Sequence, residues 1–344
     1  MSKTLIRVLC AILSIALLLT AVSCGKKGTK ILESSKAEKT PVMKIGGFDV
    51  PMELYRYIVL NYKSDFESGA SPEIWLGESG SSLLEDLHGS ATETLAFLYA
   101  TISLADEYGI HADDSFITDT VDRQMKAIYE EYDNDYEAYA EYLRSYNMND
   151  SVYRFFVRND ILAEELIAEM ERRGEIPTDE GDLRAILAGD DVVRVKQILL
   201  TAENGESDEE MDRRAADLLD RALSGEDFDT LVQKEGRDLF MFNNPDGYYA
   251  TRGIYHHEFE EAAFSLAVGE ISGVCRTDAG WSILKRYEKD PGYLDEHFDD
   301  LANDYITGQY NLRLEEREDA LLRDGIENLP ALEEYTVFNL ESTY

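Results

Sequence analysis

The side chains that most often carry chemistry are few in this sequence, and their spacing fits neither a metal site nor a catalytic triad. His256 and His257 stand beside Glu258, but adjacent helical residues point apart and no third ligand follows. The Asp133–Asp135 segment lacks the glycine and the terminal glutamate of an EF-hand loop. No Ser/His/Asp arrangement and no glycine-rich phosphate loop stands out. The sequence therefore predicts no metal and no cofactor.

The spacing of the three cysteines indicates neither a disulfide framework nor a structural metal site. Cys10, Cys24 and Cys275 have no zinc-like spacing and form no Cys-x-x-Cys pair. Arg276 follows Cys275, yet a cysteine in a predicted strand is more often packed and unreactive. We therefore expect neither a disulfide framework nor a metal-stabilised fold.

The charge balance excludes one class of partner. The chain has 344 residues, with 33 lysines and arginines against 70 aspartates and glutamates, and its formal net charge is −37. This charge would repel a phosphate backbone, and no basic stripe compensates for it, so nucleic-acid binding is excluded. Because 44% of the residues are hydrophobic and 10% aromatic, wholesale disorder is excluded as well. The length is sufficient for two domains.

The first 23 residues predict a secretory signal rather than a folded element. Lys3 and Arg7 form a basic start, and the apolar run at 8–19 is too short to span a hydrocarbon layer of about 30 Å. The small residues before Cys24 resemble the lipobox of bacterial lipoproteins. The resemblance implies that Cys24 is lipidated and anchors the protein to the extracytoplasmic face of the bacterial cell membrane. The alternative is an ordinary secretory signal in which Cys24 has no role.

Residues 24–41 predict a flexible, basic tether. They carry five lysines against two glutamates and end at Pro41. A basic tether attached to an acidic body suits an anionic lipid surface, which attracts the tether and repels the body.

Residues 42–175 predict a mainly helical, chaperone-like region. A short hairpin is expected over 42–50, around Gly46 and Gly47. Apolar residues at spacings of three and four then indicate helices. Their expected ranges are 51–62, 83–108, 114–131, 136–146 and 150–173. The acidic stretch 174–191, which contains Pro177, is the expected domain boundary.

From residue 192 the pattern changes to that of a compact α+β unit. A β-branched run indicates a buried strand, and amphipathic stretches indicate helices. The expected elements are a strand at 192–200, helices at 208–224 and 228–235, a loop at 236–253, a helix at 257–266 and a hairpin of 273–277 with 281–287. Beyond Pro291 a long helix to about residue 324 and a strand at 335–339 follow. We expect the segment 291–344 to pack on the N-terminal region.

Three short motifs follow one another in the second half of the chain. They are Phe-Glu-x-Ala-x-Phe from Phe259, Val-Gly-Glu-Ile-Ser from Val268 and Thr-Asp-x-Gly from Thr277, and VRVKQILL precedes them at 193–200. With these motifs, residues 192–290 resemble a parvulin-type, PpiC-like peptidyl-prolyl cis-trans isomerase domain.

A second resemblance lies in the helical region. The segment LADEYGIHADDSF at 104–116 and the helices around it resemble the N-terminal region of PrsA- and SurA-type extracytoplasmic foldases. The order of lipobox, helical region, parvulin unit and C-terminal helix resembles that of PrsA-type foldase lipoproteins.

The resemblance implies isomerisation of X-Pro bonds, whose rotational barrier is about 18–20 kcal/mol. A twisted amide has lost its resonance and charge separation, so a dry apolar pocket favours it over the planar ground state. By resemblance, Tyr255 and Phe259 are the proline-pocket residues. Asp238 lies next to the twisting amide, and Thr277 faces the same pocket, which implies catalytic roles for both.

Two positions depart from the family pattern. Parvulins typically carry two histidines that face each other across the central strands, and Gln197 and Ser282 occupy the matching positions. Since an amide and a hydroxyl can each donate and accept, one interpretation is a hydrogen-bonded pair that still shapes the pocket and serves catalysis. The other is that the active site has decayed and the domain only holds peptides.

The sequence thus predicts an α+β protein with a parvulin-like β-α-α-α-β-β domain inserted between a SurA-like helical region and a long C-terminal helix. The expected function is that of a membrane-anchored foldase that binds unfolded, newly exported polypeptides and isomerises their X-Pro bonds. The alternative is a non-catalytic holding chaperone with a degenerate parvulin domain. A lipid bilayer, reached through Cys24, is the second expected partner, and formation of a homodimer stays open.

Overall fold

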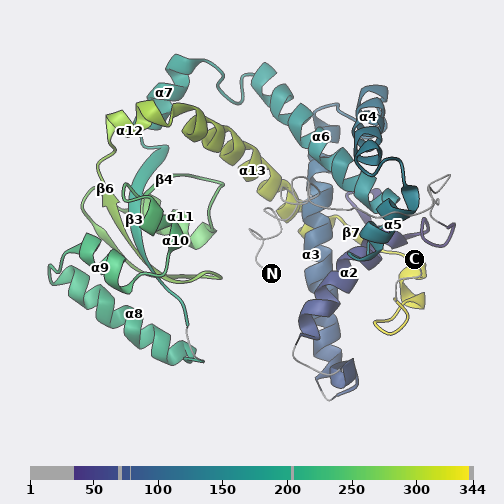
Figure 1. Ribbon diagram of the computed structural model, residues 1–344, viewed down its shortest axis with the longest axis horizontal. Coiled ribbons are helices and arrows are strands. Elements are labelled where there is room, and N and C mark those ends of the chain that lie inside the picture. The colour runs from purple at the N-terminus through teal and green to yellow at the C-terminus, as the bar shows by residue number, and fades with distance from the viewer. Residues whose placement is uncertain (1–34, 69–71, 78, 203–204, 341–344) are drawn as a thin grey trace. The chain divides into compact units, whose positions relative to one another are not determined.

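The computed structural model describes residues 35–340 apart from 69–71, 78 and 203–204 (Figure 1). The predicted signal peptide and Cys24 lie outside the described residues. The described chain divides into two compact units. Unit 1 comprises residues 35–169 and 314–340, and unit 2 comprises residues 170–313.

Unit 1 combines helices with a small antiparallel sheet. The strands lie in the order β2 (Phe48–Pro51), β1 (Pro41–Ile45) and β7 (Ile326–Asn328). The predicted hairpin is confirmed, because β1 and β2 pair across Gly46 and Gly47, whose φ angles are +59° and +86°. Side chains with a Cβ rarely adopt this left-handed region, so the turn requires its glycines.

The helices of unit 1 match those expected from the apolar spacing. They are α2 (Met52–Phe66), α3 (Gly80–Glu107), α4 (Ser115–Glu131), α5 (Tyr136–Arg144) and α6 (Asp150–Arg172, in unit 1 up to Glu169), with a 3-10 turn η2 (Pro72–Leu76) before α3. Leu87, Leu95 and Leu98 of α3 are buried, as their spacing predicts. Within the described ranges, no helix combines the length and the apolarity needed to cross a membrane.

Residues 35–40, predicted as part of a flexible tether, are folded. The backbone N–H of Lys39 donates to the carbonyl of Ser35 at 3.2 Å. Glu38 forms an ion pair of 3.2 Å with Arg56 of α2, and the two side chains are only 13% and 7% exposed. The tether prediction is wrong for these residues, because the nearly buried guanidinium of Arg56 draws Glu38 onto the helix.

The chain returns to unit 1 at its C-terminal end. The last helix, α13 (Phe298–Asp324), belongs to unit 2 up to Arg313 and to unit 1 from Leu314. Arg317 donates to the Ser103 hydroxyl of α3 at 2.6–2.9 Å, and β7 then pairs with β1.

The prediction of a strand at 335–339 is wrong, because these residues form no strand. The strand of this region is β7, and a 3-10 helix, η3 (Pro330–Glu334), follows it. Asn339 explains the difference, because its amide donates to the carbonyl of Glu334 and accepts from the N–H of Thr336. Such local side-chain bonds offer the backbone an alternative to a strand ladder.

Unit 2 is built on a four-stranded antiparallel sheet. Its strands lie in the order β4 (Tyr248–Thr251), β3 (Val192–Leu200), β6 (Gly280–Tyr287) and β5 (Ile271–Thr277). Its helices are α7 (Glu180–Ala188), α8 (Asp208–Leu223), α9 (Phe228–Glu235), α10 (Leu239–Asn243), α11 (His257–Ser265) and α12 (Pro291–Glu296), followed by the first part of α13. The α+β class predicted from the sequence is confirmed.

Three of these elements were not expected. Helix α7 lies within the expected domain boundary, and its Leu187 packs with Val192, Tyr249 and Leu301. Helix α10 and strand β4 lie within the expected loop 236–253. They are five and four residues long, too short to show a hydrophobic period.

The alternation along β3 and β6 separates two cores. Ile198, Leu200 and Ile283 face one side of the sheet and pack with α8 and α9. Val195 and Leu284 face the other side and pack with α11, which lies across the sheet in Figure 1. Because side chains alternate along a strand, Gln197 of β3 and Ser282 of β6 are expected on the α11 side.

Candidate active site

A buried polar network joins β3, β6 and the start of α10. The Ser282 hydroxyl donates to Gln197 Oε1 at 3.1 Å, and Gln197 Nε2 donates to Asp238 Oδ2 at 2.6 Å. The three side chains are buried. Leu199 pairs with Ser282 across the strands, so Gln197 and Ser282 are diagonal neighbours on one face. The structure therefore brings together three of the four residues predicted as catalytic.

Tyr248 of β4 is a fourth member of this network, and the sequence analysis missed it. Its hydroxyl donates to Asp238 Oδ2 at 2.7 Å. Burial, together with the hydrogen bond to Asp238, raises the pKa of Tyr248, so the hydroxyl keeps its proton and continues to donate. A tyrosine at the start of a short strand carries no signal of such a partner. Only the path of the chain through α10 brings the two together.

The hydrogen bonds of the network converge on Asp238. Besides the donors from Gln197 and Tyr248, its Oδ1 accepts from the backbone N–H of Phe240 at 2.9 Å and caps α10. With both oxygens held, the carboxylate has one orientation. The network therefore fixes Asp238 without a histidine.

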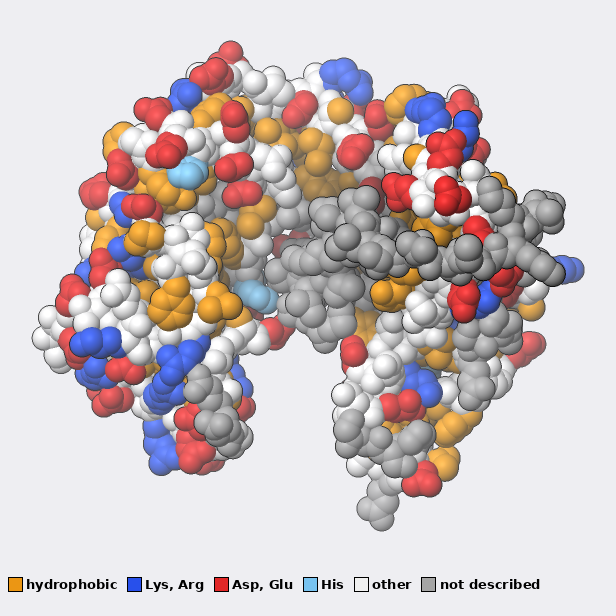
Figure 2. All heavy atoms as spheres, viewed as in Figure 1, with side chains coloured by type: hydrophobic (Ala, Val, Ile, Leu, Met, Phe, Trp, Pro, Cys, Tyr) orange, Lys and Arg blue, Asp and Glu red, His pale blue; other side chains and the backbone are white. Residues whose placement is uncertain are grey.

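Four aromatic rings adjoin the network. The ring of Tyr248 stacks on Phe240 with centroids 4.4 Å apart and meets Tyr255 and Phe259 edge-on at 5.5 and 5.6 Å. Tyr255 and Phe259 lie 5.1 Å apart. Phe259 is 5% exposed and Phe240 is 40% exposed, so this aromatic cluster extends from the interior to the surface. Figure 2 shows hydrophobic side chains among charged ones on the visible face of unit 2.

Glu260 connects the two predicted proline-pocket residues. Its buried carboxylate accepts from the backbone N–H groups of Gly253, Ile254 and Tyr255 at 2.8–3.0 Å. Burial raises the pKa of Glu260, and these three donors oppose that rise. The loop that carries Tyr255 is thereby held to α11, which carries Phe259.

Helix α13 supports the same loop from within unit 2. Asn311 Nδ2 donates to the carbonyl of Gly253 at 2.7 Å. A Cβ on Gly308 would lie 2.2 Å from the carbonyl oxygen of Arg252, closer than real Cβ atoms come. Only glycine allows this close approach of helix and loop, so α13 helps to position Tyr255.

Thr277, the fourth residue predicted as catalytic, lies outside the network. It ends β5, and its Oγ1 accepts from the N–H of Ala279 at 3.2 Å in the turn before β6. Cys275, opposite Ser282, has its pKa raised by burial to about 11, so its thiol stays protonated at neutral pH. Among the described residues, no three His, Cys, Asp or Glu side chains are arranged to hold a metal ion.

Comparison with known proteins assigns this part of the chain. The family model described as rotamase, the PPIC-type PPIASE domain, matches residues 196–288. These residues form a parvulin-type rotamase domain. The family prediction is therefore confirmed, and so is the placement of the parvulin domain between a helical region and a C-terminal helix.

The chain is similar to two groups of curated proteins. It is 28% identical over 202 residues to the foldase protein PrsA of Caldanaerobacter subterraneus, a match covering 55% of this chain and 60% of that protein. It is 32% identical over 106 residues to the chaperone SurA of Nitrosococcus oceani, covering 30% of this chain and 25% of that protein. The chain is thus PrsA- and SurA-like, and it spans no more than 60% of the length of these two relatives.

A solved structure gives a comparison over a larger share of the chain. The crystal structure of PrsA from Bacillus anthracis aligns with a TM-score of 0.38 and 17% sequence identity. The alignment covers 67% of this chain and 95% of that one.

Proposed function

We propose that the protein binds unfolded exported polypeptides and catalyses the cis–trans isomerisation of their X-Pro bonds. The aromatic cluster beside the fixed carboxylate of Asp238, within a rotamase-type domain, carries this proposal. Rotation about an amide breaks no bond and needs no nucleophile. It needs apolar surface that favours the twisted, less polar amide over the planar one. The half-buried Tyr255 offers this surface, and Phe259, which is 5% exposed, backs it with its ring 5.1 Å away.

The network supports the catalytic interpretation over the decayed one. Gln197 and Ser282 form a direct hydrogen bond at the two positions where parvulins carry histidines, and they pass the interaction on to Asp238. In our proposal this pair fixes the carboxylate beside the twisting amide. Catalysis then requires the geometry of the pair and not the titration of an imidazole.

A peptide assay tests the isomerase. The full-length protein in detergent should accelerate cis-to-trans conversion of short X-Pro peptides about tenfold or more, which requires only about 1.4 kcal/mol of preference for the twisted amide. Since the chain carries a charge of −37, peptides with a basic X should be converted fastest, and added salt should reduce this advantage.

The holding chaperone makes a different prediction in the same experiment. Folded protein that accelerates no X-Pro peptide, yet suppresses the aggregation of an unfolded client, would contradict the isomerase and support a domain that only holds peptides.

We also propose that Cys24 is lipidated and anchors the protein to the extracytoplasmic face of the cell membrane, as its lipobox-like context suggests. Cells fed radiolabelled palmitate should label the wild-type protein. Cys24→Ser should abolish the label, and Cys275→Ser, the matched control, should retain it. Persistent labelling of Cys24→Ser would contradict the proposal.

A further inference from the structure

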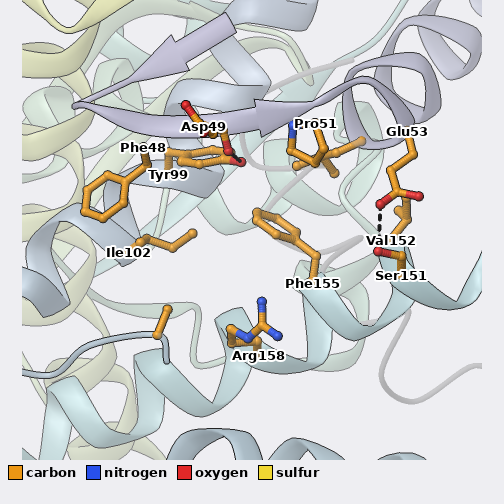
Figure 3. Close-up of a pocket in the computed structure, with 12 residues that line it drawn as sticks. Phe48, Asp49, Pro51, Glu53, Tyr99, Ile102, Ser151, Val152, Phe155 and Arg158 are labelled. Carbon is orange, nitrogen blue, oxygen red and sulfur yellow. Dashed lines mark hydrogen bonds between the residues drawn. The ribbon is translucent and has the colours of Figure 1, made fainter. Parts of the chain in front are cut away.

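Unit 1 contains a pocket of about 300 Å³ between β2, α3 and α6 (Figure 3). This volume lies at the lower end of the range for small-ligand sites, about 300–1,000 Å³, so it suits one or two residues of a chain. Its apolar wall includes Phe48, Tyr99, Ile102 and Phe155. Figure 3 shows Arg158 of α6 directed into the same space as these side chains.

Arg158 has no partner in the described part of the chain. Its Nε is buried without a hydrogen bond, and no ion pair of its guanidinium occurs there. Burial and the neighbouring guanidinium of Arg154 lower the pKa of Arg158. It nevertheless keeps its charge, because an arginine stays protonated in proteins.

The acids near Arg158 and in the pocket wall are already occupied. Asp49, which lines the pocket with a largely exposed side chain, forms an ion pair of 3.8 Å with Lys44. Asp122 attracts Arg158 electrostatically but is bound to Arg154 at 2.7 Å. Glu53, which lines the pocket, accepts from Asn149 Nδ2 at 2.8 Å and from the Ser151 hydroxyl at 2.7 Å. A partly buried, unpaired charge is unfavourable unless a partner of opposite sign compensates for it. The pocket thus has one cation available to an anionic ligand.

We propose that this pocket binds the C-terminal carboxylate of a polypeptide whose last side chain is apolar. The carboxylate pairs with Arg158, and the last side chain lies against Phe48, Tyr99 and Phe155. Strand β2, which contributes Phe48, is at the edge of its sheet, and an edge strand can pair with an extended peptide. The inference depends on the proposed function only in taking a polypeptide as the ligand.

A chain terminus fits this pocket better than an internal acidic residue. At a C-terminus, one residue supplies both the carboxylate and an apolar side chain. An internal aspartate or glutamate supplies only the carboxylate, and its neighbours in an extended chain point to the opposite side. The small pocket therefore selects the residue that carries both groups.

Binding of proline-free peptides to the full-length protein in detergent tests the proposal independently of any isomerase activity. The probe is an octapeptide of glycine and serine that ends in Leu-Phe and carries an N-terminal fluorophore, and the readout is anisotropy. The free acid should bind about 10- to 100-fold more tightly than its C-terminal amide, the range expected for a charge-assisted hydrogen bond. Arg158→Leu should remove this difference, and Arg158→Lys should retain part of it.

Arg123→Gln provides the matched control, since Arg123 is an exposed arginine of α4 in the same unit. It should leave the preference for the free acid unchanged. Arg158→Leu removes an unpaired charge, so its thermal unfolding midpoint should not fall, which separates lost binding from lost folding. Equal binding of acid and amide would overturn the proposal. Equal loss of the preference for the free acid in Arg158→Leu and Arg123→Gln would also overturn it. So would tight binding of an amidated peptide whose only acid is an internal glutamate.

Discussion

Replacing Asp238 with alanine should lower the free energy of unfolding of unit 2 by about 3–5 kcal/mol, the range for removing one partner from a buried charged network. The side chain is 8% exposed and accepts from Gln197, Tyr248 and the N–H of Phe240. Alanine leaves the Tyr248 hydroxyl without its acceptor, leaves Gln197 Nε2 with only its longer bond of 3.3 Å to that hydroxyl, and removes the cap of α10. Tyr248→Phe removes only one of the donors and should lower the free energy of unfolding of unit 2 by only about 1 kcal/mol.

Asp227→Ala is the matched control. Asp227 also caps a helix, α9, by accepting from the N–H of Thr230 at 2.9 Å, but it is exposed and belongs to no buried network. Asp227→Ala should therefore lower the free energy of unfolding by clearly less than Asp238→Ala. The chain has two tryptophans, so in a Trp75→Phe background the emission of buried Trp281 reports urea unfolding of unit 2. Equal losses for Asp238→Ala and Asp227→Ala would show that the network contributes nothing to stability.

The sequence is informative about this site where local pattern and tertiary structure agree. The β-branched run of β3, the helical period of α11 and the hairpin pattern of β5–β6 predict the elements that carry Gln197, Phe259 and Ser282. The choice of these three as site residues follows from the family resemblance. Asp238 and Tyr255 follow from the family resemblance. The residues that hold them in place do not follow from it. Tyr248, for example, contacts Asp238 only because of the path that the chain takes through α10.

The remaining differences share one physical cause. A helical pattern does not record what the helix packs against, so the division of α13 between the two units, with Gly308 against Arg252, was not predictable. The same holds for Arg158. Its spacing in α6 resembles that of any solvated arginine, and the absence of a partner is a property of the packed unit.

Replacing Phe259 with alanine should reduce kcat/KM for X-Pro peptides about 30- to 100-fold. In the proposed mechanism the proline ring rests on Tyr255 and on the small exposed part of Phe259. Removing the Phe259 ring, which lies 5.1 Å from that of Tyr255, withdraws about 2–3 kcal/mol of direct contact and of support for Tyr255 from the twisted amide. Phe259 also packs edge-on against Tyr248 at 5.6 Å, so the substitution loosens the ring next to Asp238. Phe259→Leu keeps apolar area without the ring, so its kcat/KM should lie between those of the wild type and Phe259→Ala.

Phe264→Ala separates the proline surface from general packing. Phe264 lies on the same helix and packs on the same core as Phe259, but its ring faces Arg252, whose guanidinium lies 4.3 Å from the ring centroid. The same truncation there should change kcat/KM less than about threefold, because it leaves the ring contacts among Tyr248, Tyr255 and Phe259 in place. Trp281 emission shows that each variant is folded under assay conditions. If Phe264→Ala reduced activity as much as Phe259→Ala, the loss would reflect loosened packing of α11, and Phe259 would have no special contact with the proline.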